Sequence, residues 1–152
     1  GLVGTIADTP LPTVDQTKWT KPLVVNKANT TMSLHGWSAI AESLDINTGS
    51  QVNKLDYIGE ELVDIGDRAG TGTAVVKATS LAEVNWFAIA RSETLGSLTA
   101  QHGTVAGNIV KFDSDAVQIG RPTEGNTNGI RNYSLPLMIT SLGTTELKIT
   151  AK

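Results

Sequence analysis

The chain lacks cysteine altogether and has only two histidines among its 152 residues. Without cysteine it has no disulfide framework, no thiolate zinc site and no thiol nucleophile. It also lacks any apolar run close to the roughly 20 residues that a membrane-spanning helix requires. The opening Gly-Leu-Val-Gly is too short for the apolar part of a secretory signal and follows no basic residue. We therefore expect no membrane partner.

Charged residues are scarce as well, at 18% of the chain, and the formal net charge is −3. A protein that binds nucleic acid independently of its base sequence needs a basic surface. In this chain lysine and arginine are scattered along the sequence. Such binding is not expected, although DNA can still pass close to a neutral or acidic wall. Thr, Ser, Asn and Gly are abundant, which favours short strands and turns over long surface helices. Hydrophobic residues, at 39%, suffice for one domain with a core.

Alternation of apolar and polar residues predicts short strands along most of the chain. The predicted strands cover residues 37–47, 52–58, 71–78, 95–101, 108–112, 116–120, 130–142 and 147–151. Turns or loops are expected at 48–50, 67–70, 102–107 and 121–129, where Gly, Asn and polar residues gather. Pro136 lies inside the clearest strand, which indicates a sheet edge or a bulge there.

One helix is predicted, over residues 80–92. Ser80 and Glu83 have the Ser-x-x-Glu spacing of a capping box, and apolar residues follow at helical spacing. Trp86 and Phe87 on this helix are expected to join the core. About seven or eight strands with one flanking helix predict a mainly β fold, an antiparallel β-sandwich or a partly closed barrel.

The first 29 residues have no sustained period and contain three prolines, Pro10, Pro12 and Pro22. We interpret residues 1–29 as an extended arm or a linker from an upstream module, and residues 30–152 as the β domain. Because the chain begins with Gly1, we expect a processed, tagged or truncated start. Trp19 in the arm is a candidate anchor, either for a partner surface or for the body of the chain itself.

The candidate catalytic residues do not form a pattern. His35 and His102 are far apart in sequence, neither has an acidic residue within one helical turn, and no Gly-x-Ser-x-Gly elbow is present. We expect structural or solvated histidines. The glycine-rich run 66–73 lacks the lysine of a phosphate-binding loop, and a strand pattern follows it, so it is interpreted as a turn between strands.

Two groups of carboxylates were candidates for metal binding or catalysis. Asp113 and Asp115 lack the remaining ligands of a calcium loop, so a solvated turn is expected. The acidic stretch with Glu60 and Glu61, flanked by Asp56 and Asp64, is interpreted as a charged loop or strand edge that deters stray pairing. The sequence therefore predicts no catalytic, cofactor-binding or metal-binding residue.

Several segments in order resemble the C-terminal half of the siphophage tail tube (major tail) protein family. The matching segments are 21–29 (Lys-Pro-Leu-Val-Val-Asn-Lys-Ala-Asn), 33–36, 42–44, 86–91, 95–96, 102–104, 106–110 and 146–150. The resemblance runs from about Trp19 to the C-terminus and depends on the order and number of matches. Chains of that family are about twice as long, with two similar β modules, and this sequence resembles the second module.

The resemblance implies a function in a phage tail. Such subunits form stacked trimeric or hexameric rings around a channel that carries DNA as passing cargo, and their partners include the tape measure and tail terminator proteins. It implies a protein of the virion, assembled in the host cytoplasm, with no enzymatic activity and no cofactor. Two alternatives stay open: a receptor- or carbohydrate-binding sandwich module of a tail, and an enzyme on a small barrel.

Overall fold

The computed structural model describes residues 21–66, 68–143 and 145–152, and this part of the chain forms eleven strands and one short helix. The elements are β1 (Thr30–Leu34), β2 (Trp37–Ser38), β3 (Ala41–Asn47), β4 (Val52–Tyr57), β5 (Glu60–Ile65), β6 (Gly70–Lys77), α1 (Trp86–Arg91), β7 (Leu95–His102), β8 (Val110–Ile119), β9 (Thr123–Thr127), β10 (Ile130–Thr140) and β11 (Lys148–Ala151). The predicted fold class, mainly antiparallel β with one flanking helix, is confirmed.

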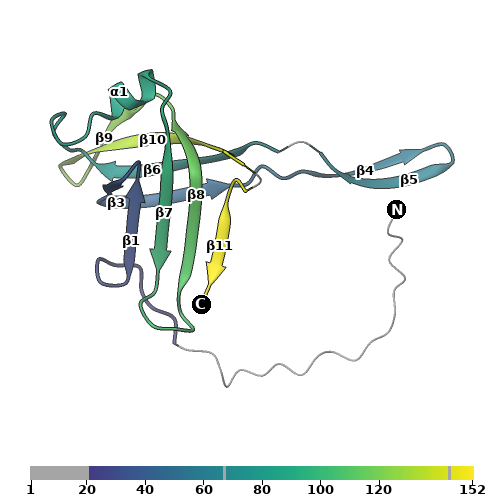
Figure 1. Cartoon of the computed structure of the whole chain (residues 1–152), viewed down its shortest axis with the longest axis horizontal. Coiled ribbons are helices and arrows are strands. Elements are labelled where there is room, and N and C mark those ends of the chain that lie inside the picture. Colours follow the sequence, from purple (N-terminus) through teal and green to yellow (C-terminus); the bar gives the residue numbers. More distant parts are fainter. Residues whose placement is uncertain (1–20, 67, 144) are drawn as a thin grey trace.

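Nine of these strands belong to one sheet with the order β2-β1-β7-β8-β10-β6-β3. The other two strands of this sheet are side branches, because β11 pairs with β8 and β9 pairs with β10. The sheet branches at these two long strands and folds over into two layers. One layer holds β1, β7, β8 and β11, and the other holds β3, β6, β9 and β10, and the layers cross in projection (Figure 1). The sheet is not closed, since β2 and β3 lie at its two ends.

The core lies between the two layers and under α1. Its buried side chains are mostly Leu, Val and Ile from β1, β6, β7, β8 and β10, with Trp86 from the helix. Trp37 packs edge-on against Trp86, with ring centroids 5.6 Å apart. Phe87 makes the same kind of contact with Tyr133, at 5.5 Å. Aromatic pairs of this geometry add about 1 kcal/mol beyond burial, so they fix α1 over one end of the sandwich.

Several strand predictions are confirmed, and others need correction. The strands predicted at 52–58, 71–78, 95–101 and 130–142 are β4, β6, β7 and β10 within one or two residues. The prediction of a loop at 121–129 is wrong, because β9 forms there by pairing with β10. The single strand predicted over 37–47 is divided into β2 and β3. The residues of β9 are polar, so the sequence pattern indicates a loop. The strand forms nevertheless, because backbone hydrogen bonds to β10 do not depend on side-chain polarity.

The prediction of a solvated turn at residues 113–115 is also wrong. The strands expected at 108–112 and 116–120 are one continuous strand, β8, and Ser114 in its middle is buried. Asp113 pairs with Thr99 of β7 on one side and with Lys148 of β11 on the other. Neighbouring strands on both sides hold this polar stretch extended, which local sequence does not reveal.

The helix is shorter than predicted and is capped elsewhere. The Glu83 N–H does donate to the Ser80 hydroxyl at 3.3 Å, but this closes only a separate turn. The α-helix starts at Trp86, and the Asn85 side chain accepts the N–H of Ala88 at 2.9 Å. The Glu83 carboxylate accepts the indole N–H of Trp37 at 3.2 Å. In a capping box the same carboxylate would accept the backbone N–H of Ser80.

Pro136 lies in an internal strand and not at an edge. On one side, β10 pairs with β6 along its whole central part. On the other side, β10 pairs with β9 up to Ser134 and with β8 from Leu137 onwards. Its carbonyl accepts the Gly120 N–H at 2.7 Å, so its backbone nitrogen faces this second side. Pro136, which has no N–H to donate, therefore lies between the segment that pairs with β9 and the segment that pairs with β8. Few hydrogen bonds between strands are lost there.

We expect Leu135→Ala to lower the free energy of unfolding by about 2–5 kcal/mol, because Leu135 is 0% exposed at the centre of β10. Met138→Ala on the same strand is the matched control, with Met138 53% exposed, and should change stability by about 0.5 kcal/mol or less. Urea unfolding followed by tryptophan fluorescence measures both values. Equal losses for the two variants would contradict the assignment of the inner face of β10.

Candidate assembly surface

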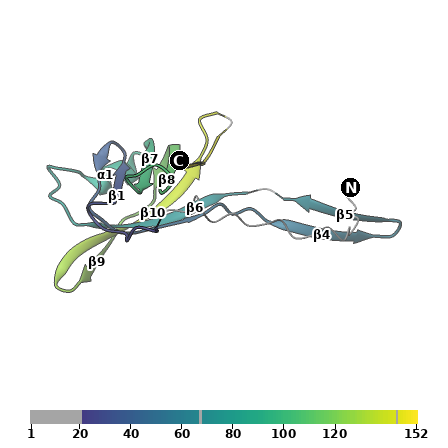
Figure 2. The same ribbon diagram turned by 90° about the horizontal axis from the view of Figure 1, so that it is seen from below.

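The β4–β5 hairpin reaches out of the body of the molecule. It continues the β3–β6 pair beyond the core and forms a separate two-stranded sheet, with the register running from Val52 opposite Ile65 to Tyr57 opposite Glu60. Its tip is a two-residue turn in which Gly59 has φ +95°, a conformation that glycine adopts without strain. Figure 2 shows the hairpin at one end of the molecule and β9 at the other.

Both faces of this hairpin expose apolar side chains. Val52, Val63 and Ile65 lie on one face, Leu55 and Tyr57 lie on the other, and all five are exposed. Ile58 at the tip is fully exposed. A lone two-stranded sheet is marginally stable in water, and clustered exposed apolar groups mark interaction sites. The hairpin is therefore a candidate contact surface.

The hairpin is also acidic. Asp56, Glu60, Glu61 and Asp64 lie on it, and Lys54 is its one basic residue. The Lys54 ammonium lies 2.6 Å from the Glu61 carboxylate and 3.4 Å from that of Asp56. The sequence predicted a charged loop or strand edge here. The structure makes Glu60–Ile65 a regular strand, and none of the described cavities is lined by these carboxylates.

The main sheet offers a free edge as well. β3 pairs with β6 and with no other strand of the described chain. A groove of about 280 Å³ opens between β3 and the layer of β1, β7 and β8, with Met32, Leu44 and Phe112 among its lining. A free strand edge is a template for pairing with another chain. The free edge of β3 is thus a second candidate contact surface.

The two histidines lie apart and serve the fold. His35 follows β1, whereas His102 is paired with Thr30 at the other end of β1. The His102 ring nitrogens form hydrogen bonds with the Thr30 hydroxyl at 2.8 Å and with the Leu23 carbonyl at 3.2 Å. No group of three or more His, Asp or Glu that could hold a metal ion is found among the residues described.

His35 is held tightly against β7 and β8. It adopts φ +51°, and its Nε2 lies 2.9 Å from the Val117 carbonyl. A Cβ atom at Gly96 would lie 2.4 Å from its ring, so only glycine leaves room for it. Burial lowers the pKa of His35 below 6.5, and the hydrogen bond to Val117 partly opposes this. The neutral ring is therefore the form that fits the fold.

Asp113 belongs to a cross-strand network and not to a calcium site. Its carboxylate lies 2.8 Å from the Lys111 ammonium and accepts the Thr99 hydroxyl at 3.1 Å. The hydrogen bond from Lys111 is the largest cause that lowers the pKa of Asp113.

The glycine-rich run 66–73 leads into β6, which starts at Gly70, and Asp67 lies outside the described residues. Trp19 lies outside them too.

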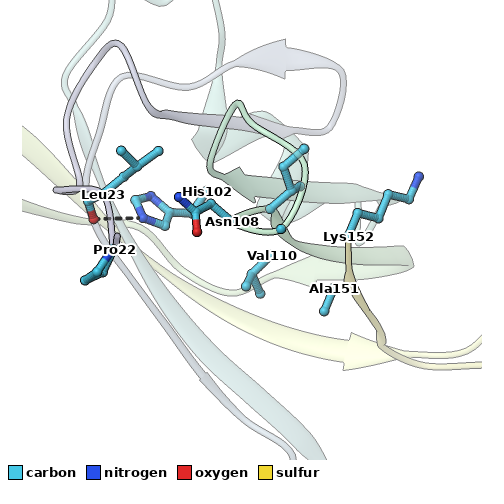
Figure 3. A pocket seen from close by; sticks show the side chains of 9 residues that line it. Pro22, Leu23, His102, Asn108, Val110, Ala151 and Lys152 are labelled. Atoms are coloured by element: carbon cyan, nitrogen blue, oxygen red, sulfur yellow. Dashed lines mark hydrogen bonds between the residues drawn. The ribbon is translucent and has the colours of Figure 1, made fainter. Parts of the chain in front are cut away.

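A hollow of about 520 Å³ lies where residues 21–23, which we call the lead-in segment, cross the β7–β8 turn and β11 (Figure 3). The His102 ring faces the Leu23 carbonyl in it, and Asn108 donates its side-chain N–H to the Lys21 carbonyl at 2.9 Å. Its polar groups are thus used to hold residues 21–23 in place.

No described helix is long and apolar enough to cross a membrane.

Solved proteins with a similar fold include parts of the anti-feeding prophage and of an extracellular contractile injection system. The sequence matches no family model and no curated protein. The cap that terminates the tube of the anti-feeding prophage superposes with a TM-score of 0.63 at 10% identity, over 88% of this chain and 95% of that one. The sheath/tube terminator of PVC, an extracellular contractile injection system, gives 0.63 at 12% identity, over 87% and 100%.

A chain from the sheath–tube complex of PVC gives a TM-score of 0.59 at 14% identity, over 93% of this chain and 100% of that one. At such identities the likeness is one of fold. This fold therefore occurs in tube-terminating components and in a sheath–tube complex of such systems. The likeness spans almost the whole of these solved chains, whereas the sequence resemblance suggested one half of a longer siphophage protein.

We expect the stability of the protein to fall as the pH drops below 6.5. The folded pKa of His35 is lower than its unfolded value of 6.5, so the unfolded chain takes up a proton first. The stabilisation that the neutral His35 ring provides is fully present above the unfolded pKa of 6.5. It is lost as the pH falls from there towards the pKa of His35 in the folded protein. Urea unfolding at about pH 7.5 and about pH 5 measures the effect.

The variant His35→Asn is the matched control for this pH dependence. Asparagine tolerates a positive φ and does not titrate, so the fall in stability between the two pH values should shrink. An unchanged fall in the variant would contradict the assignment to His35.

Proposed function

We propose that this chain is a structural subunit of a phage-like tail tube, which self-associates into rings stacked around a channel and has no enzymatic activity. The observation that carries the proposal is the β4–β5 hairpin, an isolated two-stranded sheet with exposed apolar side chains on both faces. Such an element needs a neighbour, and in a homo-oligomer the neighbour is another copy of the chain.

The fold supports the same proposal independently. The solved chains that it matches are described as a tube-terminating cap, a sheath/tube terminator and part of a sheath–tube complex. The free edge of β3 supplies a second contact between copies. Rings of three or six subunits, with tape measure and tail terminator proteins as partners, are the specific form of assembly that we propose, located in the virion and assembled in the host cytoplasm.

The electrostatics of the chain suit a channel. The net charge is −3, and the outer face of β6 carries small side chains, Thr71, Thr73 and Val75. A wall of this kind does not hold DNA through counterion release. DNA is thus passing cargo in this proposal. The division into an arm at 1–29 and a domain at 30–152 belongs to it as well, with the arm as a contact between rings.

A receptor- or carbohydrate-binding module would need an aromatic cleft open to solvent. Trp86 is buried, and Trp37 packs against it and gives its indole N–H to Glu83. These two tryptophans thus serve the core. An enzyme would need polar groups that converge in a cavity, and the side chains of His102 and Asn108 in the hollow of about 520 Å³ bind the chain's own backbone.

The proposal predicts rings or tubes when the purified chain is concentrated and viewed by negative-stain electron microscopy. A variant in which residues 51–66 are replaced by Asn-Gly keeps the β3–β6 pair and should remain monomeric, because the projecting apolar surface is gone. Sedimentation velocity gives the mass of both proteins, and circular dichroism checks that the variant folds.

Met138→Ala is a suitable control for this experiment, because it changes an exposed apolar residue away from the hairpin. Rings formed equally well without the hairpin would remove the hairpin from the assembly surface. A full-length chain that stays monomeric at every concentration would contradict the tube function itself.

A further inference from the structure

We infer that the hairpin of one copy docks on the opposite end of the next copy, on a basic surface formed where β3 begins, β6 ends and the β9–β10 turn lies. This inference rests on the proposed tube function and names the partner surface that the hairpin requires. We call it the basic end surface, and it consists of Ile40, Glu42, Lys77, Ile130 and Arg131.

The basic end surface encloses a hollow of about 250 Å³. Backbone hydrogen bonds join its parts: the Lys77 N–H donates to the Ile40 carbonyl at 2.9 Å, and the Ala78 N–H donates to the Arg131 carbonyl at 3.0 Å. These bonds hold three separate segments of the chain in one place. The surface is therefore already formed in the single chain.

Its net charge is basic because Lys77 and Arg131 outnumber its one carboxylate, Glu42. Glu42 accepts the Thr127 hydroxyl at 3.1 Å and 3.0 Å, and the Asn132 amide at 3.0 Å. Lys77 and Arg131 are exposed, and neither forms an ion pair with another residue of the described segments. Two basic side chains thus stand beside the hollow and are available to a partner.

The hairpin matches this surface in both charge and hydrophobicity. Glu60 and Asp64 are exposed on the hairpin, and neither takes part in an ion pair within the part of the chain that is described. Ile58 at its tip is fully exposed, as a counterpart for Ile40 and Ile130, which are 60% and 59% exposed. Apolar contact supplies most of the affinity, and opposite charges select the orientation and speed the encounter.

The two surfaces lie at opposite ends of the molecule (Figure 2), so a copy cannot bury its own hairpin. Each copy offers a hairpin to one neighbour and a receptor to another, which is a heterologous contact. Such contacts close into a ring when the rotation between copies allows it and otherwise continue as a filament. This head-to-tail arrangement explains why a chain would keep an apolar hairpin exposed.

The groove of about 280 Å³ that Met32, Leu44 and Phe112 line is a weaker match for the hairpin. Its lining contains no lysine and no arginine, and Glu42 is its only formally charged residue. An acidic hairpin in that groove would gain no opposite charge. The hollow near Arg68 is also less suitable, because Arg68 already pairs with Glu146 at 3.1 Å.

Charge reversal in the full chain tests the inference. The hairpin-reversed variant carries Glu60→Lys and Asp64→Lys, and the end-reversed variant carries Lys77→Glu and Arg131→Glu. Each variant presents like charges to its own copies, so the concentration needed for half-assembly should rise at least about tenfold. An equimolar mixture should assemble again, because each hairpin then meets a surface of opposite charge on the other variant. Sedimentation velocity measures all three samples.

Lys21→Glu with Lys152→Glu is the matched control for the end-reversed variant. It makes the same change in net charge at two exposed side chains near the hollow at residues 21–23, which shares no lining residue with the basic end surface. Its assembly should stay within about twofold of that of the unaltered chain. Urea unfolding of every variant confirms that the fold is retained.

The outcomes separate this inference from the proposed function. Recovery of assembly in the mixture supports the docking of hairpin on basic end surface. Normal assembly of the end-reversed variant, or loss of assembly that the mixture does not restore, overturns the docking and leaves the tube function intact. An unaltered chain that never assembles overturns both.

Discussion

The structure depends on the antiparallel pairing of β10 with β6 on one side and with β9 and then β8 on the other. Because β10 changes partner near Pro136, the sheet branches and can fold over into two layers. The side chains that the layers enclose, Leu135 and Leu137 among them, are almost completely buried. The burial of this apolar surface stabilises the fold, and the polar outer faces of the strands follow from the same alternation.

The same arrangement leaves certain elements without a partner. The sheet is open, so β3 has a free edge, and the β3–β6 pair continues past the core as the β4–β5 hairpin. Nothing in the described body covers the apolar side chains of that hairpin. In a soluble monomer such an element lowers stability and invites aggregation, whereas in an assembly it is the contact itself. The function that we propose thus follows from what the fold leaves uncovered.

The titratable groups that the structure buries or pairs serve the fold. His35 fills the space beside Gly96, His102 fastens the lead-in segment, and Asp113 joins neighbouring strands. Each of the three has a hydrogen-bond partner within the chain. Acidic side chains gather on the hairpin, whereas Lys77 and Arg131 lie at the other end of the molecule.

The sequence by itself determined the fold class, most of the strands and the absence of thiol chemistry. Alternation over β6, β7 and β10 was readable because each of these strands has one buried face. β9 and the middle of β8 were misread, because pairing partners far along the chain hold those polar stretches extended. The assembly surfaces were not readable at all: Lys77 and Arg131 are 54 positions apart and meet only through the β6–β10 pairing, and whether Ile58 is covered is a property of the folded body. Tertiary structure decided these because exposure and proximity arise only when strands distant in sequence pack together.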